Sequence, residues 1–207
     1  MEIDISDSNF FYQDMSVDLA NQILDLLQSN CKEYFDYGFW KYNHPIDSDD
    51  PLVGLHLKVV RSTACTSKYD IWATAGLNES AELCVNITVV LPPKVWQKNV
   101  CIDRAELIGI ISHELHHVAQ SNCTETFPTN RRKEKMSYFL DPYEVEAFHI
   151  GFRAHSHFSG RSFENLAEQY IRLTASNLTR DEINFVVKTW QETSFEVFES
   201  CRENGAQ

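Results

Sequence analysis

The stretch Asp103 to Asn122, DRAELIGIISHELHHVAQSN, constrains the fold of this chain more than any other segment. Its apolar residues recur at the spacing of one helical face, which predicts an amphipathic helix with one buried stripe. Asp103, followed three residues later by Glu106, matches a capping box and marks the helix start. The stripe consists of Leu107, Ile110, Ile111, Leu115 and Val118.

The same stretch contains an H-E-x-x-H pattern between His113 and His117. Residues four apart share one helical face, so the imidazoles of His113 and His117 can converge on one ion. Glu114 lies beside them, where a carboxylate can take a proton from metal-bound water. His116 is offset from the line joining the two ligands, and we expect it to be a supporting or surface residue. The pattern predicts a zinc site with Glu114 as general base.

This helix resembles the active-site helix of the zincin group of zinc metallopeptidases. The resemblance implies hydrolysis of a peptide bond in a peptide or protein substrate. It is sharpest in the H-E-x-x-H core and extends over roughly residues 83–152.

The segments before the motif predict a helix followed by a sheet. Apolar spacing predicts a long amphipathic helix from Ser16 to about Phe39. Three short segments then read as strands joined in an antiparallel meander. These strands are Leu55–Arg61, Tyr69–Ala75 and Leu83–Leu91, the last ended by prolines.

The sequence predicts a helix that backs the sheet, then the sheet, then the helix with the H-E-x-x-H pattern. This order is similar to that of zincins. We therefore expect an α+β, zincin-like fold with a small antiparallel or mixed sheet. The whole chain, 1–207, is expected to form one domain, with helix and sheet in 1–100 and a helical, metal-binding part in 101–207. By the resemblance, substrate could pair with an open edge near residues 83–91, although an ordinary core strand explains this segment equally well.

Residues 123–140 read as a polar loop, and helices follow. Asp141 and Pro142 are matched start signals for a helix that runs to about His155. Further helices are expected at about 163–176 and 180–201, the latter announced by Thr179 and Glu182.

A catalytic zinc site needs a third protein ligand, and two glutamates of this helix compete for the role. Glu144 and Glu146 point roughly 200° apart, so at most one reaches the ion. Small residues on the Glu144 face, Ala147 and Gly151, favour Glu144, although it could instead complete a capping box with Asp141. His149, His155 or no further protein ligand remain as alternatives.

A glutamate downstream of the motif resembles the gluzincin arrangement. The E-x-x-A step at Glu144 resembles the ImmA/IrrE-type peptidases and phage-encoded metallopeptidases. The resemblance thus implies the ligands His113, His117 and Glu144. Candidates to stabilise an oxyanion, none ranked by the sequence, are Tyr138, Tyr143, His149, His155 and His157.

Two other functions fit part of the pattern. One is a catalytically idle, zincin-fold binding or regulatory protein, which the presence of Glu114 disfavours. The other is a di-iron carboxylate protein that uses two E-x-x-H pairs. Those pairs would be Glu114/His117 and Glu146/His149, joined by glutamates drawn from Glu33, Glu168 and Glu196.

Composition excludes several classes of partner. The formal net charge is −12, which disfavours binding to nucleic acid or to an anionic membrane surface. The acidic N-terminus lacks the apolar core of a signal peptide, and no apolar run reaches membrane-spanning length. Six scattered cysteines then read as reduced thiols, and we expect a cytoplasmic protein.

Overall fold

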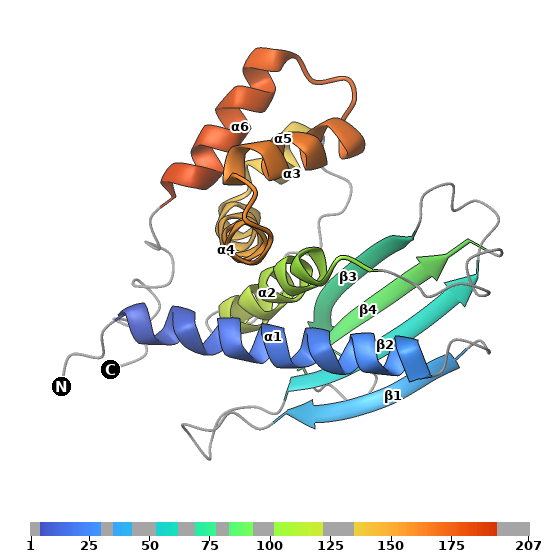
Figure 1. Cartoon of the computed structure of the whole chain (residues 1–207). Coiled ribbons are helices and arrows are strands. Elements are labelled where there is room, and N and C mark those ends of the chain that lie inside the picture. Colours follow the sequence, from blue (N-terminus) through green and yellow to red (C-terminus); the bar gives the residue numbers. More distant parts are fainter. Residues whose placement is uncertain are drawn as a thin grey trace.

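A computed structural model describes residues 5–29, 35–42, 53–61, 69–77, 83–92, 102–121 and 135–193. These residues form an α+β fold, in which a four-stranded sheet is accompanied by helices (Figure 1). The elements are α1 (Ile5–Ser29), β1 (Phe35–Tyr42), β2 (Val53–Arg61), β3 (Asp70–Leu77), β4 (Leu83–Leu91), α2 (Arg104–Ser121), α3 (Lys135–Phe139), α4 (Pro142–Ser159), α5 (Phe163–Thr174) and α6 (Arg180–Glu192).

The sheet has the strand order β1-β2-β4-β3 and is mixed. Strand β4 runs parallel to β2 and antiparallel to β3, while β1 and β2 are antiparallel. The predicted antiparallel meander is therefore wrong, because β4 inserts between β2 and β3. Residues Cys84–Val90 pair on both sides, so the expected open edge near residues 83–91 is also wrong. Among the described strands, β1 and β3 are the edges.

The predicted N-terminal helix is correct in kind and wrong in extent. Helix α1 starts before Ser16 and ends at Ser29, and Phe35–Tyr42 is the strand β1. The sequence of that strand, FDYGFWKY, is rich in aromatic residues and contains a glycine, a composition that favours a strand over a helix.

One hydrophobic core lies between the sheet and helices α1 and α2. Alternate residues of β4 enter it, as expected for a strand with one face against helices. Ile87 is central: its neighbours across the sheet are Leu57 and Ala73, and both pack in the same core. From α2, four residues of the predicted stripe enter this core, namely Leu107, Ile111, Leu115 and Val118. The prediction is wrong for Ile110, which is half-buried outside this core, and Ile108 is buried there instead.

The start of α2 is joined to the sheet through Tyr69, at the beginning of β3. The Asp103 side chain caps the helix by accepting from the Ala105 N–H. Glu106 does not close the predicted capping box with the Asp103 backbone. Instead the Tyr69 hydroxyl accepts from the Asp103 N–H at 2.9 Å and donates to Glu106 at 2.6 Å. The phenol thus bridges the two groups that a capping box joins directly.

A second hydrophobic core holds helices α3, α5 and α6 together with the first part of α4. Trp190 is fully buried there and packs on Phe148 with ring centroids 4.1 Å apart. The predicted start of α4 is confirmed, with Asp141 at the N-cap and Pro142 at the first turn. The Thr179–Glu182 capping box of α6 is also confirmed. Short helix α3 occupies part of the segment expected to be a loop.

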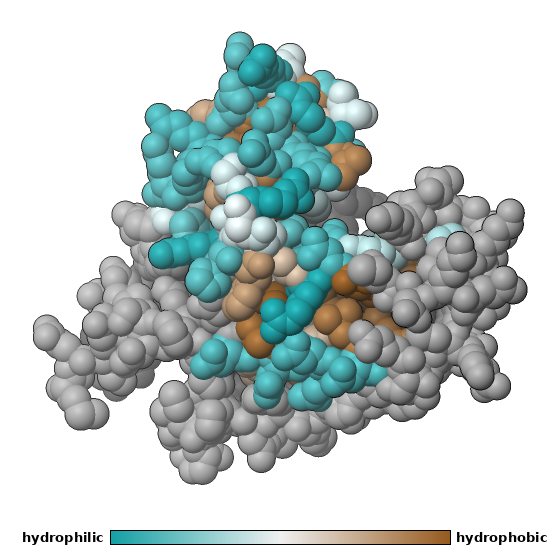
Figure 2. Space-filling model, in the orientation of Figure 1, coloured by the Kyte–Doolittle hydropathy of each residue, from teal (hydrophilic) through white to brown (hydrophobic). Residues whose placement is uncertain are grey.

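Helix α4 contributes to both cores. Its residues Val145 and Phe148 belong to the second core, whereas Ala154 belongs to the first. In the view of Figure 2, the described C-terminal helices present a mainly hydrophilic surface, and hydrophobic residues gather where α2 meets the sheet. No described helix is long and apolar enough to cross a bilayer.

Two glycines bring α2 and α4 into backbone contact. A Cβ on Gly151 would lie 2.9 Å from the Gly109 carbonyl oxygen and 3.0 Å from the His113 Cβ. A Cβ on Gly109 would lie 2.8 Å from the Gly151 carbonyl oxygen. Only hydrogen fits in either place, so this pair sets the distance between the two helices.

We predict that Gly151→Ala pushes α4 away from α2 and destabilises the chain by about 1–3 kcal/mol, the cost of overpacking against backbone. Urea unfolding measures the loss. Gly76→Ala is the control, because nothing lies within 4 Å of its added methyl group. Equal effects of the two substitutions would contradict the close contact.

Candidate metal site

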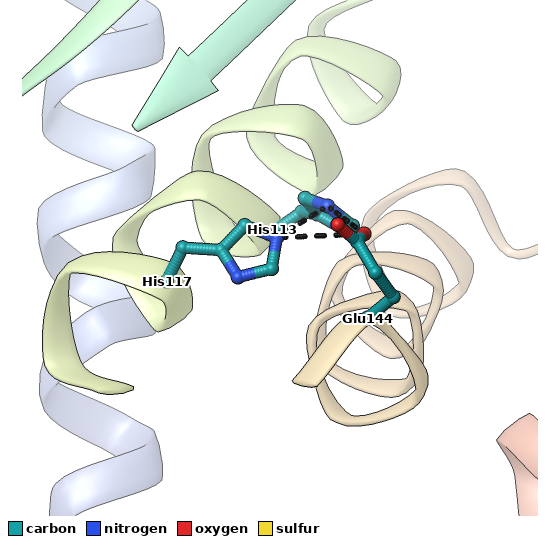
Figure 3. A group of neighbouring side chains, drawn as sticks. All are labelled: His113, His117 and Glu144. Atoms are coloured by element: carbon teal, nitrogen blue, oxygen red, sulfur yellow. Dashed lines mark hydrogen bonds and ion pairs between the residues drawn. The ribbon is translucent and has the colours of Figure 1, made fainter. Parts of the chain in front are cut away.

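Three side chains from α2 and α4 point toward one another and could hold a metal ion (Figure 3). His113 and His117 come from consecutive turns of α2, and Glu144 comes from the first turn of α4. The two Nε2 atoms lie 3.2 Å apart. The Glu144 Oε2 atom lies 3.6 Å from His113 Nε2 and 3.5 Å from His117 Nε2. The structure thus brings together the three ligands predicted from the sequence.

These separations fit a small tetrahedrally coordinated ion. Ligands about 2.0–2.1 Å from a tetrahedral metal lie about 3.3 Å from one another. A triangle with the three measured sides has a circumradius of about 2.0 Å, so an ion about 2.1 Å from each atom would lie just above the plane of the triangle. The three donors occupy one face of such a tetrahedron, and a fourth position is left for another ligand.

The structure also separates the two competing glutamates. Glu144 does not complete a capping box, because its carboxylate lies at the two histidines. The Asp141 side chain caps α4 through the Tyr143 N–H. Glu146 points to the other side, where it accepts hydrogen bonds from His116 and Gln120 and is 2% exposed. Glu144 is therefore the ligand candidate, and His116 is a buried partner of Glu146.

The three side chains form an ion-pair cluster. Burial raises the pKa of Glu144, but hydrogen bonds and charges from His113 and His117 outweigh it and bring the pKa to about 2. Burial lowers the pKa of His117, and the Glu144 carboxylate outweighs this effect, so the net shift is upward. The Glu144–His117 pair therefore favours its charged form, and a metal ion would replace the positive charge of the imidazole.

Glu114 lies within this electrostatic neighbourhood. Its side chain is 8% exposed, and its negative charge helps to raise the pKa of His117. It also acts on Tyr170 of α5, whose pKa rises to about 12 through burial and the charges of Glu144 and Glu114. Sequence reasoning did not single out Tyr170, since its position follows from the packing of α5 on α4 and from no local motif.

The structure ranks the candidate oxyanion donors. Tyr138 in α3 lies against the site, where burial and interaction with the Glu144 carboxylate raise its pKa, so its phenol keeps its proton. His149 instead uses Nδ1 to contact the Trp190 carbonyl at 2.7 Å. The ring of His157 is exposed and packs on Phe158, and His155 packs over Gly109.

The described residues do not gather the ligands of a di-iron centre. Glu146 and His149 are engaged with residues other than Glu114 and His117, and Glu168 forms a surface ion pair with Arg172. Glu33 and Glu196 lie outside the described residues. Within the part of the chain that is described, the cluster of His113, His117 and Glu144 is the one group suited to a metal.

No protein-family model, curated protein or solved structure matches this chain.

We predict a pH window for the stability of the metal-free chain. The pKa of Glu144 is lowered from 4.5, so its contribution is full above that pH and is lost as pH falls toward the folded value. The pKa of His117 is raised from 6.5, so its contribution is full below 6.5 and is lost as pH rises through the folded value. The pair therefore stabilises most between about pH 4.5 and 6.5.

Urea unfolding with a chelator, compared between the wild type and Glu144→Gln, isolates this contribution. The difference in unfolding free energy should be largest near about pH 5.5 and smaller near about pH 3 and about pH 9. A difference that stays constant with pH would show that the cluster is not ionised in this way.

Proposed function

We propose that this chain is a zinc-dependent metallopeptidase with a zincin-like fold. The observation that carries the proposal is the triangle of His113, His117 and Glu144, with sides that suit a tetrahedral ion. Glu114, next to His113 on the same helix, adds the base that hydrolysis requires. The H-E-x-x-H pattern and its resemblance to the zincin active-site helix support the same reaction class.

The donor set favours zinc over harder ions. Two imidazole nitrogens and one carboxylate oxygen, with a fourth position left open, form the ligand pattern of catalytic zinc in hydrolases. Calcium and magnesium prefer sites built from oxygen. Zinc held by His113, His117 and Glu144 would polarise a substrate carbonyl and lower the pKa of bound water, which is chemistry that protein side chains do not supply.

The chain's own residues supply the proton transfer. Glu114 is mostly buried beside the ligands, so its carboxylate can accept a proton from the attacking water and return it to the leaving amine. Tyr138 keeps its phenolic proton and lies next to Glu144, so it can donate a hydrogen bond to the oxygen on which negative charge develops.

Substrate binding is proposed at the edge of β3. This strand pairs with β4 on one side, packs against α2, and is an edge among the described strands. An extended peptide could add to it by backbone hydrogen bonds. This proposal replaces the expectation for residues 83–91, where both sides of β4 are already paired.

The first test is the metal content of protein purified without added metal or a histidine tag. We expect about one zinc per chain. Glu114→Gln should keep the zinc and lose about 100- to 10,000-fold in peptide hydrolysis, since it removes the base and no ligand. His113→Ala is the matched control and should lose the zinc as well.

The outcomes separate the alternatives. Two irons per chain would favour the di-iron protein, and no metal after zinc is offered would refute the site. Zinc binding with hydrolysis equal in wild type and Glu114→Gln would remove Glu114 from the mechanism. Zinc binding with no hydrolysis of any peptide in a broad library would favour the idle binding protein.

A separate prediction concerns Tyr138. Tyr138→Phe should lower kcat by about 100- to 1,000-fold, the usual effect of deleting one oxyanion donor, while zinc affinity and KM change little. Steady-state kinetics combined with zinc competition by a chelator measures both. A fall in zinc affinity that matches the fall in rate would instead make Tyr138 a structural support for Glu144.

A further inference from the structure

A buried polar group lies directly behind the candidate ligands and takes no part in the proposed chemistry. It consists of Gln120 on α2, Glu146 on α4 and His116 on α2. Their exposed fractions are 5%, 2% and 5%. Polar side chains buried this deeply cost stability unless their hydrogen bonds are made, so the bonds that they form are informative.

The partners of Gln120 fix the orientation of its amide. Its Nε2 lies 3.0 Å from the Tyr143 carbonyl oxygen and 3.0 Å from Glu146 Oε2. Both partners can only accept, so the amide NH₂ must face them and both of its hydrogens are used. The amide oxygen is left to face His117, whose Nδ1 lies 2.8 Å away.

This orientation selects one tautomer of His117. An amide oxygen can only accept, so Nδ1 of His117 must carry a proton and donate it to Gln120. In the neutral ring, Nε2 then holds the lone pair. That atom faces His113 and Glu144 at 3.2 and 3.5 Å. Gln120 therefore presents His117 in the form that binds a metal.

The same amide also acts on the third ligand. Tyr143 immediately precedes Glu144, and its carbonyl is held by Gln120 across the interface between the helices. One side chain thus orients the ring of His117 on α2 and fixes the first turn of α4, from which Glu144 extends. Glu146 accepts from both Gln120 and His116, so it anchors the amide in place.

We propose that Gln120, anchored by Glu146, is the positioning residue of the metal site. It sets the tautomer of His117 and the placement of Glu144, and it does so without touching the ion or the substrate. This inference rests on the proposed zinc site and assigns to Glu146 a role distinct from ligation.

The test measures zinc affinity by chelator competition and ligand geometry by the visible spectrum of the cobalt-substituted protein. Gln120→Met keeps the length of the side chain and removes all its hydrogen bonds. Glu146→Leu removes the anchor, whereas Glu146→Gln keeps an oxygen that can accept from Gln120 and His116. We expect the first two variants to lose about 10- to 100-fold in zinc affinity with an altered cobalt spectrum, and Glu146→Gln to stay close to wild type.

Ser112→Ala is the matched control, because it also deletes a buried hydrogen bond of α2, the one to Ser16 on the side away from the site. It should leave affinity and spectrum unchanged. Circular dichroism verifies that each variant folds. If Gln120→Met does not fold, the test is the comparison of zinc affinity and cobalt spectrum between Glu146→Leu and Glu146→Gln.

Wild-type affinity in Gln120→Met and Glu146→Leu, or an equal loss in Ser112→Ala, would overturn the positioning role while leaving the zinc site intact. Failure of the wild type itself to bind zinc or cobalt would overturn the proposed function, and this inference with it.

Discussion

The backbone contact between α2 and α4 at Gly109 and Gly151 is the constraint on which the site depends. The axes of two helices that bear ordinary side chains lie roughly 8–10 Å apart, whereas a glycine pair lets the two backbones touch. Gly151 also lies against the Cβ of His113, so the contact is made at the first ligand itself. Glu144, which lies about two helical turns before Gly151 in α4, then reaches across to both histidines.

Two carboxylates on the same turn of α4 are buried in different ways. Burying a carboxylate is costly unless charges or hydrogen bonds replace its water. Glu144 obtains this compensation from two imidazoles that a metal can also use. Glu146 obtains it from an amide and the ring of His116. The two glutamates therefore differ in their partners. Glu144 lies beside two imidazoles and is a ligand candidate, whereas Glu146 is bonded to an amide and to His116 and supports the site.

Much of this arrangement could be predicted from sequence, because its determinants are local. The histidine spacing, the Asp141–Pro142 start and the Thr179–Glu182 box each depend on residues within one or two helical turns. The small residues on the same face as Glu144, Ala147 and Gly151, also favoured the glutamate that lies beside the two histidines. Gln120 could have been found by the same logic, since it lies one turn beyond His117 on the same face.

What depends on distant contacts was not predictable in this way. Strand order is set by pairing between segments far apart, so β4 could not be placed between β2 and β3 from its own residues. The predicted capping box at Asp103 does not form, because the hydroxyl of Tyr69 bonds to both the Asp103 N–H and the Glu106 carboxylate. Tyr69 lies more than thirty residues earlier in the chain. Tyr170 likewise approaches the site only because α5 packs on α4.

The division of α4 between two cores has a further consequence. The histidines extend from a helix anchored in the sheet core, and Glu144 extends from a turn anchored in the core around Trp190. If the proposed ion is held by all three, it can bind only when both cores are docked, so its binding energy would add to the free energy of docking. Metal supply would then act on the tertiary structure as well as on the chemistry, because loss of the ion would weaken the contact between α2 and the first turn of α4.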